Sequence, residues 1–184
     1  MHTPITMDDI DDKIKSKVFP QDYTRQDTIE GVKLISPKII EGEDGDFSEI
    51  LRIDDNGQME GLDGFNLRQI NRTRLYPNSV KAWHVHFKQN EMWYMNPSFN
   101  LLVGLWDLRK DSPTVGKLMR IALGGSNAKL LYIPHGVAHG SANFSGQSVQ
   151  LYYFVDQRFN IEDPDEKRLH WDAQGADFWK PVRD

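Results

Sequence analysis

The 184-residue chain predicts an all-β fold, a sandwich or barrel built from short antiparallel strands. Short apolar segments recur from residue 29 onward, turn sequences rich in Gly, Asn and Pro separate them, and no segment there sustains an amphipathic helix for three turns. The apolar segments cover residues 32–35, 39–40, 47–53, 65–70, 80–87, 92–95, 101–108, 118–123, 129–133 and 149–155. The main turn sequences lie at 42–45, 55–57, 76–78, 124–127 and 145–147.

The two ends of the chain differ in texture from the strand-rich middle. Residues 1–28 are polar and form an N-terminal arm, with a helix predicted at 8–18 that ends before Pro20, since a proline disfavours helix in the residue preceding it. Residues 29–184 then form a single domain. Its last stretch, 156–184, is charged and contains two tryptophans, so we expect a short C-terminal extension wrapped around the outside.

Composition excludes several classes of function. The net charge of -5 comes without a block of basic residues, so no nucleic-acid partner is expected. No apolar run approaches the roughly 20 residues that cross a bilayer, so no membrane association is expected. The chain has no cysteine, which excludes disulfides and thiolate ligands. The polar N-terminus lacks the apolar core of a signal peptide, so a cytoplasmic protein is expected.

Two histidine motifs stand in order along the chain. His84 and His86 are two residues apart, so on a strand their side chains point to the same face, and Glu91 follows after four further residues. The second motif reads Pro-x-Gly-x-x-His-x-x-x-Asn and contains His139. Together the two motifs resemble the conserved pair of the cupin superfamily. The resemblance implies a cupin-type double-stranded β-helix, or jelly-roll barrel, with the arm and the extension added at its ends.

The same four residues raise an alternative, a metal site. In many cupins this pattern holds a metal, and His84, His86, Glu91 and His139 would suit a divalent ion such as Fe, Mn, Ni or Zn. The other interpretation is that His86 and Glu91 lie at the barrel mouth and pair with each other or with water. The sequence leaves both interpretations open.

A longer run of segments resembles a narrower family, the dTDP-4-dehydrorhamnose 3,5-epimerases. The residues DLRKDSPTVGK are similar to that family's DLRKxSPTxGKW, and IPHGVAHG to its IPxGFAHGF. Weaker matches precede and follow them in the family's order. The matching segments are 31–38, 45–50, 69–84, 107–117, 133–140 and 163–172.

The resemblance implies a reaction and a set of catalytic residues. The family epimerises a nucleotide-linked 4-keto-6-deoxyhexose by removing a proton next to the ketone and returning one on the other face. This requires a base, an acid opposite it, and donors for the developing oxyanion. The resemblance makes His84 the base, places His139 near the carbonyl, and makes Asp177 the carboxylate that orients His84. No cofactor is implied.

The acid is a tyrosine on the strand after the second motif, where Tyr152 and Tyr153 are adjacent. Adjacent strand residues face opposite sides, so only one of them can line the barrel. Aligning the aspartate that follows the tyrosine in the family favours Tyr152. Aligning the family's aromatic pair beyond the tyrosine favours Tyr153 instead. We predict Tyr152 as the acid and keep Tyr153 among the substrate-binding candidates. The other substrate-binding candidates are Gln69, Asn71 and Lys81.

The chain also departs from the family pattern. His86 stands where the family has glutamine, Met92 replaces a lysine, and Lys81 replaces an arginine, which keeps the charge but loses a bidentate fork for phosphate. A variant epimerase or isomerase of a nucleotide sugar therefore fits better than the standard activity. The alternatives are a metal-dependent cupin enzyme and a non-catalytic sugar-binding cupin. The resemblance further implies a homodimer with paired barrel edges.

Overall fold

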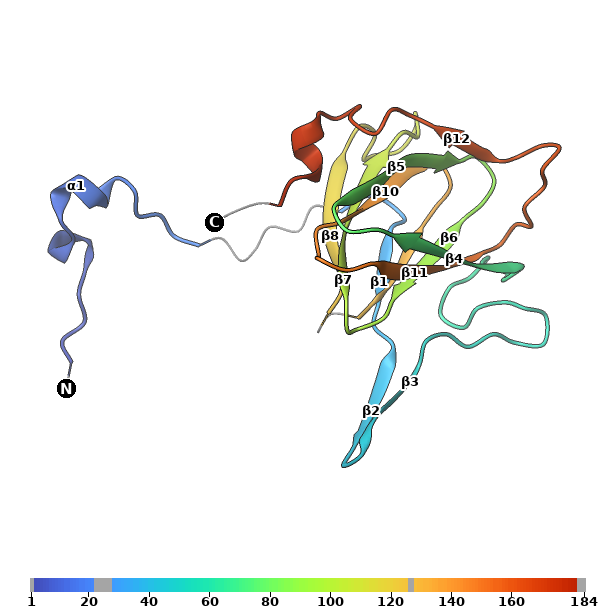
Figure 1. The fold of residues 1–184 in the computed structure, drawn as a ribbon, viewed down its shortest axis with the longest axis horizontal. Coiled ribbons are helices and arrows are strands. Elements are labelled where there is room, and N and C mark those ends of the chain that lie inside the picture. Colours follow the sequence, from blue (N-terminus) through green and yellow to red (C-terminus); the bar gives the residue numbers. More distant parts are fainter. Residues whose placement is uncertain (1, 22–27, 126–127, 182–184) are drawn as a thin grey trace.

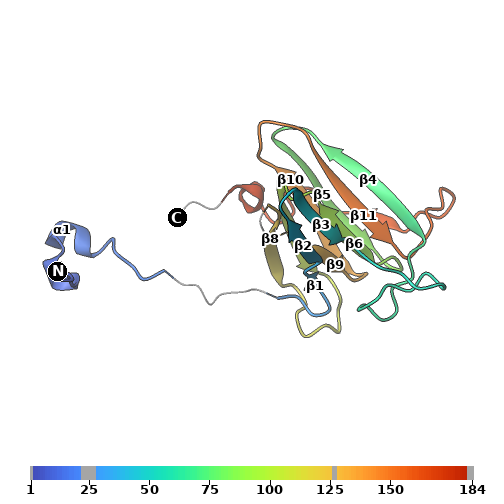
Figure 2. The ribbon, with the colours of Figure 1, turned by 90° about the horizontal axis from the view of Figure 1, so that it is seen from below.

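The computed structural model describes residues 2–21, 28–125 and 128–181, and its body consists of two antiparallel sheets that face each other (Figures 1 and 2). The first sheet has the strand order β1-β9-β6-β11-β4, and the second has the order β12-β5-β10-β7-β8. Neighbours in each sheet are mostly distant in sequence. The prediction of an all-β jelly roll is confirmed.

The first sheet contains β1 (Lys33–Ile35), β4 (Gln69–Leu75), β6 (Glu91–Met95), β9 (Leu130–Ile133) and β11 (Val149–Val155). The second sheet contains β5 (Ser79–His86), β7 (Asn100–Asp107), β8 (Leu118–Gly124), β10 (Val137–Asn143) and β12 (Glu166–Arg168). A separate hairpin consists of β2 (Lys38–Gly42) and β3 (Gly45–Glu49), and it projects from the body (Figure 1).

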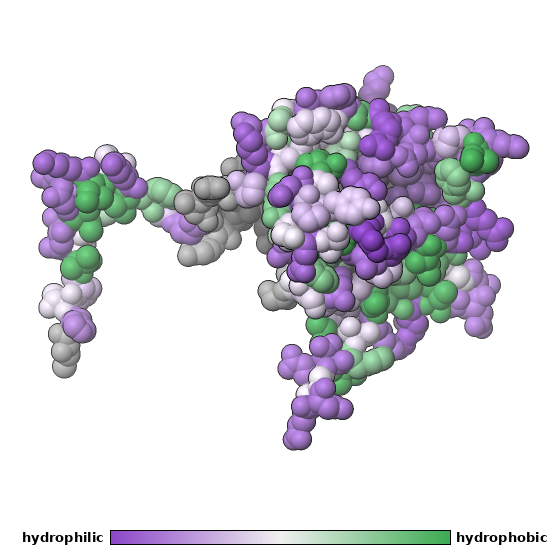
Figure 3. Space-filling view, in the orientation of Figure 1, coloured by the Kyte–Doolittle hydropathy of each residue, from purple (hydrophilic) through white to green (hydrophobic). Residues whose placement is uncertain are grey.

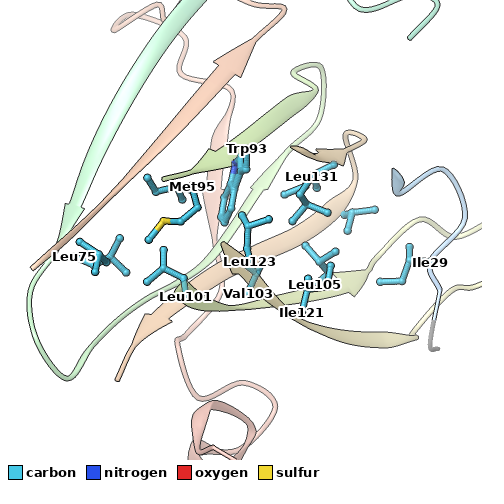
Figure 4. Close-up of a cluster of buried hydrophobic side chains, with 14 residues drawn as sticks. Ile29, Leu75, Trp93, Met95, Leu101, Val103, Leu105, Ile121, Leu123 and Leu131 are labelled. Carbon is cyan, nitrogen blue, oxygen red and sulfur yellow. The ribbon is translucent and has the colours of Figure 1, made fainter. Parts of the chain in front are cut away.

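The main hydrophobic core lies between the two sheets. Leu105 and Leu123 of the second sheet and Met95 and Leu131 of the first are at most 1% exposed and lie in one cluster (Figure 4). Trp93 lies in the same cluster and also borders the pocket described below. The core therefore fixes the separation of the sheets beside the site.

A second cluster covers the outer face of the second sheet. Trp83 of β5 packs against Trp179 of the helix η2 (Ala176–Trp179), with ring centroids 4.8 Å apart. Gly104 makes this possible, because a Cβ there would lie 2.5 Å from the ring of Phe178 and 2.7 Å from that of Trp179. The C-terminal extension thus wraps the outside, as the sequence predicts.

One buried carboxylate fastens the loop after β7 to the start of the domain. Asp107, at the end of β7, accepts hydrogen bonds from Arg109 Nε at 2.8 Å, Ser112 Oγ at 2.6 Å and Thr114 Oγ1 at 2.7 Å. Arg109 Nη2 in turn donates to the carbonyl of Glu30 at 2.6 Å. Burial raises the pKa of Asp107, but the hydrogen bonds from Arg109, Ser112 and Thr114 outweigh it and hold that pKa well below its usual range. The DLRKDSPT segment is therefore a structural anchor.

Several local predictions need correction. The predicted helix at 8–18 is reduced to the 3-10 turn η1 (Met7–Asp9) and the single-turn helix α1 (Asp12–Lys15). The segment 65–70 enters its strand only at Gln69, and the strand expected at 47–53 stops at Glu49. Strand β12 has three exposed residues and carries no apolar pattern, so periodicity could not reveal it.

Among the residues that the structure describes, no helix is long and apolar enough to cross a membrane. The division at residue 28 into arm and domain stays a prediction.

Candidate active site

A cavity of about 570 Å³ opens between the two sheets. His84, His86 and His139 enter it from the second sheet, and Glu91, Trp93 and Tyr153 enter it from the first. The segment after β11, at 157–166, contributes to its lining. Its size suits a small-molecule ligand, since such sites commonly measure several hundred Å³. The site is thus assembled from both walls of the sandwich.

His84 is held by a carboxylate from the C-terminal strand. Strand β12 pairs with β5, and this brings Glu166 Oε1 to 2.7 Å from His84 Nδ1. The hydrogen bond from His84 and its charge lower the pKa of Glu166 to about 2, against an opposing effect of burial. An ionised Glu166 can only accept, so Nδ1 of His84 carries the proton and its Nε2 bears the lone pair when the ring is neutral.

A second group of charged side chains lies deeper. Glu91 is buried, with Oε1 3.1 Å from His86 Nε2 and Oε2 3.5 Å from His139 Nε2. Gln89 Nε2 donates to Oε1 at 2.8 Å and Trp93 Nε1 to Oε2 at 2.5 Å. These three residues, His86, Glu91 and His139, offer ligand atoms that lie within 4.8 Å of one another.

The electrostatics of this group follow from its burial. Desolvation lowers the pKa of His139 to about 4, although the charge of Glu91 opposes it, so this ring is neutral near pH 7. Burial also disfavours ionised Glu91, but the neighbouring imidazoles and hydrogen bonds outweigh it and hold that pKa at about 2. The pKa of His86 is raised, because its hydrogen bond and charge interaction with Glu91 outweigh desolvation.

The structure places Tyr153, and not Tyr152, in the pocket. Tyr152 is 37% exposed and its hydroxyl lies 3.5 Å from Gln150 Oε1 on the outer side of the sheet. Tyr153 lines the cavity. The prediction that Tyr152 is the acid is therefore wrong about its orientation. The alternation on β11 is set by the inward-facing Leu151 and Val155, and Tyr153 falls in phase with them.

The structure also separates Asp177 from the site. Asp177 lies on η2, its side chain is 85% exposed, and it pairs with Lys180 at 2.5 Å. The prediction that Asp177 orients His84 is therefore wrong, and Glu166 stands in that place. The reason is topological: η2 packs on the outer face of the second sheet, whereas β12 lies beside β5 at the level of His84.

The predicted substrate-binding residues all line the cavity. Gln69 donates to Asn71 Oδ1 at 2.7 Å and accepts from the backbone of Phe159 at 3.0 Å. Lys81 Nζ donates to Thr73 Oγ1 at 2.6 Å. Met92, in contrast, is fully buried in a separate hydrophobic cluster on the other side of β6.

Sequence reasoning missed some of the residues in the cavity. Lys88 and Arg158 add cations, and Phe159 adds an exposed aromatic ring at 64% exposure. Glu166 lies within the matching segment 163–172, but no local signal marks it as a partner of His84. Only the long-range pairing of β12 with β5 reveals that contact.

Comparison with known proteins agrees with this fold and site. The family model described as dTDP-4-dehydrorhamnose 3,5-epimerase matches residues 26–180. The spore coat polysaccharide biosynthesis protein SpsL of Bacillus subtilis (strain 168) is 37% identical over 152 residues, which cover 82% of this chain and 95% of SpsL.

Two solved structures are similar as well. A dTDP sugar isomerase from Desulfovibrio desulfuricans G20 superposes with a TM-score of 0.67 at 27% identity, covering 79% of this chain and 88% of the other. The dTDP-6-deoxy-D-glucose-3,5-epimerase of Legionella pneumophila Philadelphia 1, in complex with dTDP-4-keto-L-rhamnose, gives a TM-score of 0.68 at 25% identity over 84% of this chain and 81% of that one.

The jelly roll and its histidine-lined interior define the class of protein, a cupin. Within that class, the extent of the family match and the relationship to SpsL are decisive. The chain belongs to the dTDP-4-dehydrorhamnose 3,5-epimerase family, of which it is a divergent member.

Proposed function

We propose that the protein epimerises a nucleotide-linked 4-keto-6-deoxyhexose by proton transfer at a carbon next to the ketone. His84 is the base, Glu166 orients it, and Tyr153 is the acid. The observation that carries the proposal is the placement of His84 and Tyr153 on opposite sheets, both lining one cavity. An epimerisation requires such an arrangement, because the proton must leave one face of the sugar and return to the other.

The base is prepared by its carboxylate partner. Because Glu166 accepts the Nδ1 proton at 2.7 Å, the lone pair of neutral His84 lies on Nε2. Glu166 also stabilises the imidazolium that forms when His84 takes the substrate proton. This interaction is a strong one, since both partners are then charged.

The acid is a protonated phenol. Burial, followed by the negative charges of Glu91 and Glu166, raises the pKa of Tyr153, so its hydroxyl keeps its proton at neutral pH. Tyr153 stands on β11 opposite Trp93 and Asn71 in register, on the wall that faces the second sheet. The proton transfers themselves need only these side chains.

The remaining lining supports a nucleotide-linked substrate. Lys81, Lys88 and Arg158 supply positive charge that would suit a diphosphate, and the cavity of about 570 Å³ has room for a sugar. A relative in the family is known with dTDP-4-keto-L-rhamnose bound, and SpsL is named for polysaccharide biosynthesis. The replacements of the family's arginine by Lys81 and of its glutamine by His86, both in the cavity, favour a substrate or stereochemical outcome that differs from the standard one.

The decisive experiment is hydrogen exchange with solvent. The protein is incubated in D₂O with dTDP-4-keto-6-deoxyglucose and the corresponding UDP, GDP and CDP sugars, and deuterium at C3 and C5 is measured by NMR. We expect incorporation with at least one of them and its loss in His84→Asn. Binding of a sugar without any exchange would instead identify a non-catalytic sugar-binding protein and contradict the proposal.

We further propose that the protein is a homodimer, with a second copy covering the β2–β3 hairpin. Ile39, Ile40 and Phe47 on this hairpin are 53%, 53% and 61% exposed, and Figure 3 shows hydrophobic surface near its base. An isolated two-stranded hairpin is marginally stable in water, so its apolar residues need a partner. Light scattering should give twice the mass of the 21.3 kDa chain, and Phe47→Asp should shift it toward the monomer. A monomeric wild-type protein would refute this.

A further inference from the structure

We propose that His86, Glu91 and His139 form a binding site for one divalent transition-metal ion in the depth of the pocket. Two imidazole nitrogens and a carboxylate converge there, with Glu91 Oε1 3.1 Å from His86 Nε2 and Oε2 3.5 Å from His139 Nε2. Ligand atoms on one metal ion are separated by similar distances, because each lies about 2.0–2.2 Å from the ion. All three residues are at most 7% exposed.

His139 carries the first independent indication of a ligand. Its Nδ1 lies 3.1 Å from the carbonyl oxygen of Val137, which can only accept, so Nδ1 bears the proton. In the neutral ring Nε2 is then a lone pair, and it points at a carboxylate oxygen of Glu91 without a hydrogen between them. A cation between these two acceptors would satisfy both, and its binding would displace the proton through which His86 Nε2 bonds Glu91.

The surrounding groups resemble the outer shell of a metal site. The Val137 carbonyl orients His139, and Gln89 and Trp93 donate to Glu91, whereas His86 Nδ1 is buried without a hydrogen-bond partner among the described residues and has only Asp165 Oδ2 at 3.9 Å. Ligating residues in metalloproteins are commonly held by such partners, which fix the tautomer and the ring orientation. Asp165 is itself fixed by the backbone N–H groups of residues 87, 88 and 89.

His84 is not part of this site. Its Nδ1 is engaged by Glu166, and its ring lies parallel to that of His139 with centroids 6.0 Å apart. The four-residue metal set suggested by the sequence therefore reduces to three residues, with His84 left as a base. Two histidines and one carboxylate leave coordination positions open toward the cavity.

An ion held there would supply positive charge beside the substrate carbonyl, where it would stabilise the oxyanion that develops as the proton leaves. This role rests on the proposed function. The metal site itself rests only on the three residues and their partners.

The test is metal binding by the full-length protein after removal of any affinity tag and of bound metal by a chelator. Titration with Co²⁺, followed by its visible absorption spectrum, and with Zn²⁺, followed by calorimetry, should give one ion per chain. We expect Glu91→Gln and His139→Asn to weaken binding about 100-fold or more, given that even outer-shell changes cost 10- to 100-fold. His135→Asn, at an exposed histidine, should leave affinity unchanged.

Thermal unfolding of the wild-type chain gives a measurement that does not depend on the folding of any variant. A bound ion stabilises the folded state by mass action, so the midpoint should rise with Zn²⁺ concentration. Absence of any binding at millimolar Co²⁺ or Zn²⁺, or binding that Glu91→Gln and His139→Asn leave intact, would overturn the proposal.

The outcome separates the metal site from the proposed reaction. Deuterium exchange by a protein that binds no metal would remove the site and leave the epimerase. Stoichiometric binding at these residues without exchange of any keto sugar would remove the epimerase and leave the site.

Discussion

Asp107 on one side, and Glu91 and Glu166 on the other, are carboxylates with opposite surroundings. Asp107 is enclosed by Arg109, Ser112 and Thr114, which are neighbours in the same loop and do not line the cavity. Glu91 and Glu166 instead face histidines that line the cavity. A carboxylate whose partners are all local donors serves folding, whereas one that holds an imidazole beside a cavity can serve chemistry. The contrast can be tested residue by residue.

The largest effect is expected for the base. His84→Asn should lower the rate of deuterium exchange by about 10³-fold, within the usual range for a general base, with little change in stability because the side chain is only partly buried. Exchange is followed by NMR and stability by chemical denaturation. A variant that kept more than a tenth of the wild-type rate would show that another group abstracts the proton.

Substitution of the acid, Tyr153, should affect epimer formation much more than deuterium exchange. Tyr153→Phe removes the proton donor on the first sheet, so we expect epimer formation to fall about 100-fold or more while His84 still exchanges the substrate proton with solvent. NMR coupling constants distinguish the epimer from the deuterated substrate that has not been inverted. Tyr152→Phe is the matched control on the outer side of the same strand and should behave like the wild type. Equal effects of the two substitutions would argue against an acid at 153.

The orienting carboxylate should have a smaller effect. Glu166→Gln removes the charge beside His84 and should reduce kcat about 10- to 100-fold with a much smaller change in KM, because it acts on the base and not on substrate binding. Glu166→Asp should recover part of the loss. Asp177→Asn, at the exposed position on η2, should have no effect, and a loss there would restore the role that the sequence assigned to Asp177.

The anchor should affect stability alone. Asp107→Asn weakens charge-assisted hydrogen bonds and should lower the free energy of unfolding by about 2 kcal/mol at pH 7, with activity per folded molecule retained. The pKa of Asp107 is depressed in the folded state, so its stabilisation is complete above the unfolded pKa of about 3.9 and is lost as pH falls below it. The difference between wild type and variant should therefore shrink below pH 4. Asp111→Asn, exposed in the same loop, is the control.

Much of this organisation could be predicted from the sequence. The spacing of His84 and His86 placed both on one face of a strand, and both line the cavity. The second motif brought His139 beside them, with its ring 5.5 Å from that of His86. Such features depend on local periodicity and on motif order, and both can be read from the sequence alone.

The remainder depends on pairing between distant segments. The choice between Tyr152 and Tyr153 required the register of β11 against β4 and β6, and a shift of one residue would have reversed it. The partner of His84 required the pairing of β12 with β5, two segments about 80 residues apart, which no periodicity encodes. Both predictions failed for this reason, although a tyrosine does line the cavity and a carboxylate does contact His84, as expected.

Through the pairing of β12 with β5, the C-terminal segment contributes Glu166 to the candidate active site. The strand has three residues at the edge of its sheet, and beyond it the chain is secured by Trp179, whose indole packs against Trp83 on the reverse side of the strand that carries His84. The contact of Trp179 with Trp83 thus holds the end of the C-terminal segment against β5, the same strand with which β12 pairs. The strand that carries His84 in the cavity therefore also carries, on its outer face, the Trp83–Trp179 contact of the C-terminal segment.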